Sequence, residues 1–310
     1  MSRIAILAIG GCHRDLVGRT AGRFEPGTSC PGRVAERPGG VARNVAALLA
    51  AAGPPLAVQL ATLLGADPAG DWLAAHLAAA GIGTDHLMRD PAVATGTYVA
   101  LHDQDGELVA ALSDLSVYDR LTPDRLAPLA PALAEASLVF ADANLPAETL
   151  AALAAAAGPR LAVDAVSRAK APRVLAPARA GALLFVNRPS AEALAGAPCP
   201  TAAEAAAALR SMGVARAVVT AGPQPLALLL DGEIHAVAVP PTPVVDVTGA
   251  GDALIAGTLL SLAHGRGLAD AVGVGVEAAG AALAATGALS ALPASVLRRA
   301  RDVAMKAPDR

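Results

Sequence analysis

The residues best suited to chemistry in this 310-residue chain form the segment 246–252, which reads DVTGAGD. It follows a strand-rich stretch and precedes a long apolar pattern that predicts a helix from about residue 253. Gly249 and Gly251 let a ligand approach the backbone, and the start of a helix presents unpaired N–H groups to a phosphate. Asp252, in the first helical turn, is placed to accept a proton from an alcohol aligned with that phosphate. The segment therefore predicts phosphoryl transfer with Asp252 as general base; the simpler alternative is a glycine-rich turn whose aspartate caps a helix.

Several other nucleotide-binding and catalytic motifs are missing from the chain. The P-loop pattern GxxxxGK[ST] does not occur, and Gly273 and Gly275 lie in a helical pattern rather than in a GxGxxG segment after a strand. HExxH and GxSxG are absent as well. These absences exclude a P-loop nucleotide site and argue against most dehydrogenases and hydrolases.

The elements that must position this segment are strand-like apolar runs that alternate with helical patterns. Strands are predicted at 4–9, 56–61, 138–141, 161–163, 182–186 and 217–220, and helices at 41–52, 70–80, 123–133, 147–157 and 202–212. This alternation predicts an α/β fold with a mostly parallel central sheet and helices on both faces, whose ligands bind at the carboxyl ends of the strands. From residue 250 onwards we expect helices alone.

Two segments interrupt the alternation and predict a small β lid beside the sheet. Residues 14–38 are polar and rich in Gly and Pro, and residues 95–113 form a hairpin pattern around a turn at 103–106. We expect a single domain over 1–310, with a lid formed by about 14–38 and 95–113. A second hairpin is predicted at 226–239, just before the phosphate segment.

The composition of the chain limits the classes of partner. A formal net charge of −3 gives no electrostatic reason to expect nucleic acid or an anionic membrane. Hydrophobic residues make up 54 % and aromatic residues 2 %, which predicts closely packed helices rich in alanine. The long apolar runs are interrupted by Gly and Pro, and Cys12, Cys30 and Cys199 show no CxxC spacing. We therefore expect a cytoplasmic protein without a membrane segment, a disulfide framework or a cysteine metal site.

With these motifs in this order, the sequence resembles the PfkB (ribokinase-like) carbohydrate kinases over essentially the whole chain. Residues 246–252 resemble the family signature DTxGAGD, with valine in the second place. Residues 38–44, PGGVARN, resemble its N-terminal signature and lie about 200 residues earlier. The resemblance implies a ribokinase-like fold with a β lid, ATP with Mg²⁺ as the phosphate donor, a small-molecule acceptor and Asp252 as the base.

The resemblance also implies roles for individual residues around the phosphates. An anion hole is implied for the N–H groups of Gly249, Ala250 and Gly251. Many members need a monovalent cation such as K⁺, and its ligands would correspond to Asp246 and Thr248.

On the acceptor side, the resemblance implies that Asp15 and Asn44 contact sugar hydroxyls and that Gly39 and Gly40 form the hinge of the lid. Each residue alone has a simpler interpretation. Asp15 also fits a solvated loop carboxylate, Asn44 a polar residue of a first helical turn, and the glycine pair an ordinary turn. Their joint order favours the acceptor site.

The nucleotide side departs from the family pattern at one position. The family usually carries an NxxE motif that helps to place Mg²⁺, but here Asn187 is followed at the fourth position by Ser190, and the next acid is Glu192. Two residues of helix correspond to about 200° of rotation, so Glu192 is expected to point away from the motif's position. Either water and phosphates hold the metal, or the backbone is shifted, or activity is reduced. Thr220 and Gly222 match the family's nucleotide loop and also fit an ordinary strand-ending turn.

Within the family, several stretches resemble the pseudouridine kinases: PGGVARN at 38–44, the hairpin at 95–115, ADANL at 141–145 and VDAVSRAK at 163–170. The implied reaction is ATP-dependent phosphorylation of the 5′-hydroxyl of a nucleoside, most of all pseudouridine. The candidate contacts to the base or ribose are Arg43, Ser113, Asp142, Asn144 and Lys170.

Alternative functions and assemblies remain open at this level. The same chemistry on another nucleoside, on ribose or on a fructose derivative is one alternative. A weakly active, ligand-binding homologue is another, and Ser190 is the feature that favours it. Family members often pair through their lids, and in a homodimer of this chain we expect the hairpin at 97–112 to supply the edge.

Overall fold

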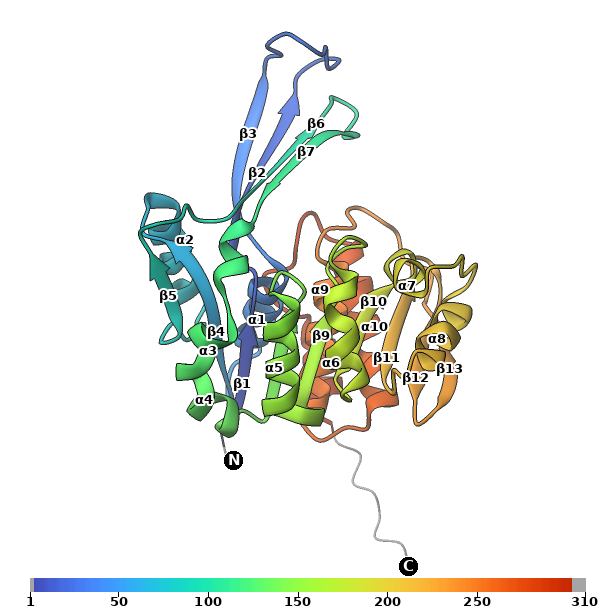
Figure 1. Ribbon diagram of the computed structural model, residues 1–310. Helices are drawn as coiled ribbons and strands as arrows, with labels where there is room; N and C mark the ends of the chain where they lie inside the picture. Colours follow the sequence, from blue (N-terminus) through green and yellow to red (C-terminus); the bar gives the residue numbers. More distant parts are fainter. Residues whose placement is uncertain (1–2, 303–310) are drawn as a thin grey trace, which may run out of the picture.

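A nine-stranded sheet forms the centre of the computed structural model, which describes residues 3–302 (Figure 1). Its strand order is β13-β12-β11-β10-β9-β8-β1-β4-β5. The strands are β1 Ile4–Ile9, β4 Leu56–Gly65, β5 Leu87–Asp90, β8 Leu138–Asp142, β9 Leu161–Asp164, β10 Leu183–Asn187, β11 Ala217–Ala221, β12 Gln224–Leu230 and β13 Glu233–Val237. All neighbours from β11 to β5 pair in parallel, and β12 and β13 add an antiparallel edge. The predicted α/β fold with a mostly parallel sheet is confirmed.

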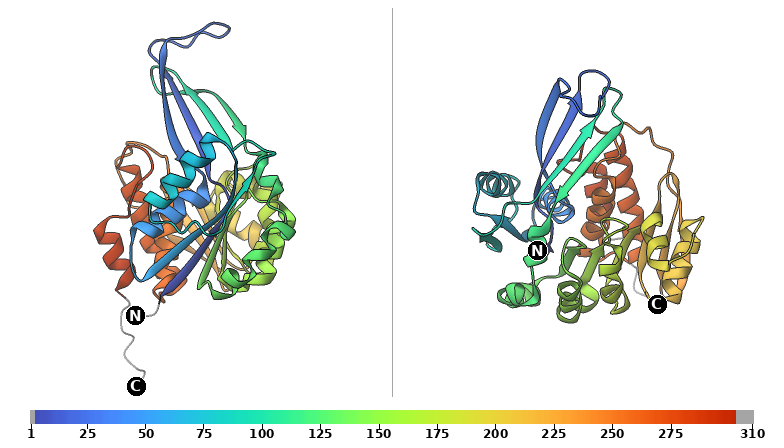
Figure 2. Two further views of the ribbon diagram at one scale, coloured as in Figure 1. Left: turned by 90° about the vertical axis from the view of Figure 1, so that its left-hand side faces the viewer. Right: turned by 45° about the horizontal axis from the view of Figure 1, so that its top comes forward.

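Helices cover both faces of this sheet, as the left view of Figure 2 shows. They are α1 Val41–Ala51, α2 Pro68–Ala79, α3 Pro123–Leu126, α4 Ala130–Glu135, α5 Ala147–Ala157, α6 Leu175–Arg179, α7 Arg188–Ala195, α8 Ala202–Ser211, α9 Ala250–Ala263, α10 Leu268–Leu283 and α11 Ala294–Arg301. The single helix predicted at 123–133 is wrong, because a 3₁₀ turn at Ala127–Leu129 separates α3 from α4. Pro128 and Pro131 lie in this stretch, where each removes a backbone donor and resists a continuous helix. Among residues 3–302, no helix is long and apolar enough to cross a membrane.

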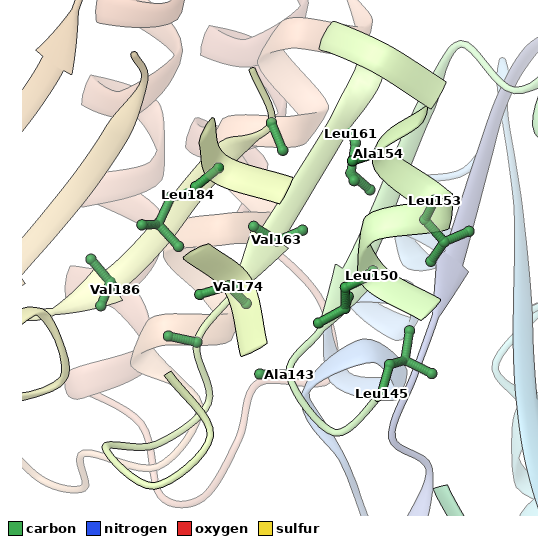
Figure 3. Packing of buried hydrophobic residues seen from close by; sticks show 14 of the residues in the cluster. Ala143, Leu145, Leu150, Leu153, Ala154, Leu161, Val163, Val174, Leu184 and Val186 are labelled. Atoms are coloured by element: carbon green, nitrogen blue, oxygen red, sulfur yellow. The ribbon is translucent and has the colours of Figure 1, made fainter. Parts of the chain in front are cut away.

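The strands of the sheet alternate their side chains between two hydrophobic cores. In β1, Leu7 and Ile9 enter one core, while Ile6 and Ala8 enter the other. Figure 3 shows the first core, where Leu150 and Leu153 of α5 pack with β9 and β10. Because both faces are buried, the strands read as nearly continuous apolar runs, which made them recognisable in the sequence.

Small residues allow α9 and α10 to pack closely in the second core. A Cβ on Gly257 would lie 2.9 Å from the Cβ of Ala278. One on Gly275 would lie 2.3 Å from the hydroxyl oxygen of Thr258. The helices therefore approach at backbone distance, which accounts for the chain's high alanine and low aromatic content. This close-packed pair fixes the start of α9, where Asp252 lies.

A four-stranded sheet projects from one end of the molecule (Figure 1). It has the order β3-β2-β6-β7, with β2 His13–Thr20, β3 Gly32–Gly39, β6 Thr97–His102 and β7 Leu108–Asp114. β2 pairs with β6 in parallel, and the outer pairs are antiparallel. Its two hairpins come from the segments 14–38 and 95–113, in which the lid was predicted.

Candidate active site

Polar side chains gather where the parallel strands of the large sheet end. Asp142 ends β8 and Asp164 ends β9, and these two residues are paired in register. Asn187 ends β10 opposite Thr220 of β11. Asp252 joins them from the first turn of α9. The carboxyl edge of the sheet is thus the candidate site, as expected for an open α/β sheet.

Asp252 is held by a residue from the other predicted signature. The side-chain amide of Asn44, in the first turn of α1, donates to Oδ2 of Asp252 at 2.7 Å. Burial raises the pKa of Asp252 to about 6, against the opposing effects of the Asn44 hydrogen bond and the Arg43 charge. At neutral pH the group is therefore a carboxylate whose proton affinity suits a general base.

The two glycines before α1 are required by the close approach of neighbouring groups. A Cβ on Gly39 would lie 2.4 Å from both carboxylate oxygens of Asp15. Gly40 has φ +103°, and its Cβ would lie 2.2 Å from the carbonyl oxygen of Gly11. The pair makes the sharp turn from β3 into α1, so the base-holding helix begins directly where the four-stranded sheet ends.

Asp142 lies beneath this turn with a relative exposure of 0 %. Its Oδ2 accepts the backbone N–H groups of Gly11 and Ala42, each at 2.9 Å, and its Oδ1 accepts that of Asn144 at 3.0 Å. These bonds tie the β1–β2 turn and the start of α1 to the end of β8. The geometry therefore favours a supporting role for Asp142 over the acceptor contact that the sequence suggested.

Two buried oxygens near Asp252 lack a hydrogen-bond donor. Among residues 3–302, Oδ1 of Asp15 and Oδ1 of Asn44 accept no hydrogen bond of good geometry, and the imidazole Nε2 of His13 lies 3.3 Å from Oδ1 of Asp15. Buried acceptors of this kind are costly unless a ligand satisfies them. Hydroxyl groups supply the missing donors, so the geometry fits a polyol or ribose beside Asp252.

Arg43, half-buried beside this region, is already engaged by the chain. Its guanidinium donates to the carbonyl oxygens of Pro38 and Gly39, so it braces the turn before α1. Burial lowers the pKa of Arg43, while the nearby Asp252 and Asp15 oppose that effect. Arg43 thus provides positive charge near Asp252 and Asp15, and some of its N–H groups already donate to the backbone.

Asn144 and Lys170 form a second polar pair at the edge of the site. The ammonium group of Lys170 donates to Oδ1 of Asn144, whose exposure is only 2 %. Burial lowers the pKa of Lys170, against the attraction of Asp142. Ser113, by contrast, is exposed on β7 of the four-stranded sheet.

The start of α9 offers free backbone donors. Gly249 is the residue before the helix and adopts a left-handed conformation at φ +76°. Within the described chain, 3–302, the N–H groups of Gly249, Gly251 and Asp252 donate no hydrogen bond, and that of Ala250 makes only a long one of 3.4 Å to the Val247 carbonyl. Of the three predicted anion-hole donors, the N–H groups of Gly249 and Gly251 are therefore free at a helix N-terminus, that of Ala250 is weakly engaged, and that of Asp252 is an additional free donor.

A cavity of about 800 Å³ opens beside these donors. Its walls come from β11, the segment after β13 and the helices α9 and α10. Its lining includes Thr220, Gly222, Leu226, Val239, Ala250, Gly251, Leu254, Val276, Gly280 and Leu283. A largely apolar cavity that ends at an anion hole fits a nucleotide, with its base in the cavity and its phosphates at Ala250 and Gly251.

Asp246 connects the phosphate segment to the loop after α10. Its Oδ1 accepts the N–H of Thr248 and its Oδ2 that of Gly287, both at 2.9 Å. These hydrogen bonds, those from Thr248 first, lower the pKa of Asp246. The carboxylate is therefore negative at neutral pH and retains lone pairs for a cation.

Ser190 occupies the position at which the family pattern NxxE has its glutamate. Asn187 caps α7 by accepting the N–H of Ser190 at 2.9 Å, and Ser190 is 1 % exposed. Glu192 accepts the N–H of Cys199 at 3.0 Å and a hydrogen bond from Arg188, so its carboxylate faces the loop after α7. Among residues 3–302, no group of three or more His, Cys, Asp or Glu side chains is arranged to hold a metal ion.

Sequence reasoning missed Asp164. Its Oδ1 accepts the N–H of Val166 at 2.7 Å, and Val166 has φ +59°, which is unusual for a β-branched residue. Burial, with Asp252 and Asp142 nearby, raises the pKa of Asp164 to about 8. The available signal was an aspartate ending a predicted strand next to the strand that leads to Asp142.

Comparisons with known proteins cover nearly the whole chain. The model of the pfkB family carbohydrate kinases matches residues 3–295. Pseudouridine kinase of Escherichia coli (strain K12) is 30 % identical over 272 residues, which cover 86 % of each chain. A carbohydrate kinase from Agrobacterium tumefaciens superposes with a TM-score of 0.83 at 32 % identity, covering 95 % of this chain and 96 % of that one. Ribokinase of Arabidopsis thaliana, complexed with ribose and ATP, gives a TM-score of 0.82 at 21 % identity, covering 97 % and 99 %, and supports the fold.

Proposed function

The chain belongs to the pfkB family of carbohydrate kinases, and we propose that it phosphorylates the 5′-hydroxyl of a nucleoside, with pseudouridine as the preferred acceptor. The observation that carries the proposal is the hydrogen bond between Asn44 and Asp252, which joins the two signature segments at one point. Asn44 itself carries one of the unsatisfied acceptors, and the start of α9, which holds Asp252, offers free N–H groups and lines an apolar cavity. The likeness to a pseudouridine kinase supports the choice of acceptor.

In this proposal, Asp252 would take the proton of the acceptor hydroxyl as the hydroxyl oxygen attacks the γ-phosphorus of ATP. The bond between that phosphorus and the β–γ bridging oxygen would break, and ADP would leave. Asn44 holds the carboxylate in place with a hydrogen bond of 2.7 Å. The N–H groups of Gly249, Gly251 and Asp252 stabilise the negative charge on the transferring phosphoryl group. Such preorganised donors act without the reorganisation that water would need.

The donor nucleotide is proposed to lie in the cavity between Thr220, Gly222 and α10. Asn187, paired with Thr220 in the sheet, would border its phosphates. Mg²⁺ is proposed to arrive with ATP and to be held by phosphate oxygens and water, because Ser190 supplies no carboxylate. When bound, it supplies positive charge against the phosphates.

A monovalent cation such as K⁺ is proposed to bind beside Asp246 and Thr248. The support is the ionised carboxylate of Asp246, which already orders the segment next to the anion hole. A cation bound there would help to hold residues 246–252 in the conformation that presents the anion-hole N–H groups. The measurable consequence is a dependence of turnover on K⁺.

The ribose is proposed to donate hydroxyl hydrogens to Asp15 and Asn44, whose buried oxygens need donors. Gly39 and Gly40 would serve as the hinge on which the four-stranded sheet closes as a lid over the acceptor. The Asn144–Lys170 pair and Ser113 remain the candidates for contacts at the base end.

The test is ADP release from ATP and Mg²⁺, with and without K⁺, over pseudouridine, uridine, adenosine, cytidine, ribose and fructose. We expect the highest kcat/KM with pseudouridine and a monophosphate product by mass spectrometry. A mock preparation from cells without the gene, taken through the same purification, measures contaminating kinase activity. Strong preference for another acceptor would keep the kinase and discard the proposed substrate.

A weakly active, ligand-binding homologue is the second candidate, favoured by the buried Ser190 in place of an acid. Pseudouridine that binds in calorimetry without turnover with any divalent metal would support it. Ser190→Glu would then be the informative variant, since it restores the acid of the family pattern. A gain in turnover would assign the weak activity to this position.

We also propose that two copies pair through the outer face of the lid. The strand register puts Val34, Val99 and Leu112 on the face opposite Asp15, with exposures of 73 %, 37 % and 68 %. Exposed aliphatic side chains gathered on one sheet face favour a self-complementary contact. Light scattering should give a dimer for the wild type and a monomer for Val34→Asp/Leu112→Asp. A wild-type monomer would remove this part of the proposal.

A further inference from the structure

An aromatic side chain lies next to Asp15 on the lid and has no role in the account so far. β2 and β6 pair so that Asp15 is opposite Tyr98, and β6 and β7 pair so that Tyr98 is opposite Ser113. Residues opposite each other in neighbouring strands project from the same face of a sheet. We propose that Tyr98 stacks on the planar base of the acceptor and so selects nucleosides over free sugars. This inference rests on the proposed nucleoside kinase function.

The face that carries Tyr98 is the one turned toward the main body. Asp15 on this face packs against Gly39, beside Arg43 of α1. Arg37, in the same register row, reaches the loop after α10, where its guanidinium lies 3.1 Å from the position of a Cβ on Gly287. The Arg37 contact connects this face to the body, and Arg43 of α1 interacts with Asp15 on the same face, so Tyr98 lies on the side of the lid that faces the body.

The spacing of the row matches the dimensions of a nucleoside. Neighbouring strands lie about 4.8 Å apart, so Tyr98 is one strand and Ser113 two strands, or about 10 Å, from Asp15. A ribose held at Asp15 would therefore place its attached base under the next strand. A free pentose held at the same point has no base to lie against the ring of Tyr98.

The other aromatic residues differ from Tyr98 in their positions, and Phe24, which is also half-buried, lies in the loop between β2 and β3 and not on a sheet face. Tyr118, Phe140 and Phe185 are among the largest fully buried side chains of the core. Trp72 packs on His76 within α2, with ring centroids 4.3 Å apart. Tyr98, in contrast, is half-buried on a sheet face occupied mostly by polar and small residues. A half-buried ring over a polar site offers stacking area that the core residues cannot provide.

The test compares Tyr98→Leu and Tyr98→Phe with the wild type. The matched control is Thr97→Val, an isosteric change in the same strand at a side chain that points to the opposite face. The readouts are kcat/KM for the nucleoside that the wild type prefers and the inhibition constant of free ribose against it. Stacking of a base on an aromatic ring contributes enough that Tyr98→Leu should lower kcat/KM about 5- to 150-fold.

We expect the inhibition constant of ribose to change less than about twofold in Tyr98→Leu, because a free sugar has no base to stack on the ring. We also expect Tyr98→Phe to stay within about threefold of the wild type, because the ring rather than the hydroxyl makes the contact. Equal losses for nucleoside and ribose would assign Tyr98 to lid structure and overturn the inference, as would no loss in Tyr98→Leu. A wild-type enzyme that accepts only free sugars would instead refute the nucleoside function itself, and the stacking role with it. The substrate profile of the wild type therefore separates the two failures.

Discussion

Replacing Asp252 by asparagine should make the protein almost inactive and, at the same time, more stable. Asparagine has the shape of the aspartate, and its side-chain oxygen can still accept the hydrogen bond from Asn44. It cannot accept a proton from the acceptor hydroxyl. Because a positioned general base contributes about 10²- to 10⁴-fold, turnover should fall by that factor while nucleoside binding persists.

The gain in stability follows from the raised pKa of Asp252, about 6 against 3.8. Between these values the folded state binds the proton and the unfolded state does not, so the stability of the wild type falls as the pH rises through this window. The difference of about 2 pH units corresponds to about 3 kcal/mol, which is fully expressed above the folded-state pKa. The side-chain amide of the Asp252→Asn variant carries no charge, so the variant escapes this cost.

Urea unfolding of wild type and Asp252→Asn at several pH values measures this effect. We expect the variant to be more stable by up to about 3 kcal/mol near pH 8, and the difference to shrink toward zero near pH 4. Asp246→Asn is the control of opposite sign. The pKa of Asp246 is lowered by hydrogen bonds from Thr248 and Gly287, so its neutral replacement should destabilise the protein above pH 4.

The two halves of this prediction fail separately. Turnover in Asp252→Asn equal to that of the wild type would refute Asp252 as the base. The variant must show the same order of preference among acceptors as the wild type, because a contaminating kinase would show a different one. A variant that is less stable than the wild type near pH 8 would refute the argument from burial. Either result would leave the fold and the family intact.

The remaining predictions concern the same region. In a pH profile, kcat/KM of the wild type should fall about tenfold per pH unit below about pH 6, because protonated Asp252 is not a base; a flat profile down to pH 5 would contradict this. Gly39→Ala should lower acceptor affinity and thermal stability, because its Cβ would lie 2.4 Å from the Asp15 carboxylate. Gly22→Ala, where nothing lies within 4 Å, should be neutral in both assays. Asp142→Ala leaves three buried N–H groups without an acceptor and should destabilise the protein by about 3 kcal/mol or more in urea unfolding; a loss below about 1 kcal/mol would contradict its supporting role.

Most of the fold could be predicted because its elements have local sequence patterns. The strands of a parallel sheet are buried on both faces, so they form short apolar runs, and the helix predicted at 147–157 coincides with α5. The helix predicted at 123–133 failed because composition favoured a helix while two prolines divided it. α7 was missed because it spans only eight residues and begins with Arg188 and Pro189, so its pattern is short and polar at the start.

Site residues could be predicted from the sequence where only one residue type fits the local backbone. They were harder to predict where the role of a side chain depends on what surrounds it in the folded chain. Gly40 is such a predictable case, because its positive φ and contact with Gly11 admit no side chain. Asp142 was assigned to the acceptor, yet its oxygens hold backbone N–H groups, which only the folded chain brings together. Tyr98 gave no signal in the sequence, because its position beside Asp15 arises from a parallel pairing between distant segments.

Asp142, Asp164 and Asp252 lie at the same edge of the sheet, and three negative charges there would repel an anionic nucleotide. Their different environments reduce this repulsion. The oxygens of Asp142 are surrounded by three N–H groups, which compensate its charge. Burial raises the pKa of Asp164 to about 8, so Asp164 carries a proton at neutral pH and adds no charge. An ionised Asp164 would raise the pKa of Asp252 further, because like charges disfavour each other. The same burial that keeps Asp164 neutral thus leaves Asp252 to titrate near pH 6, where a general base is effective.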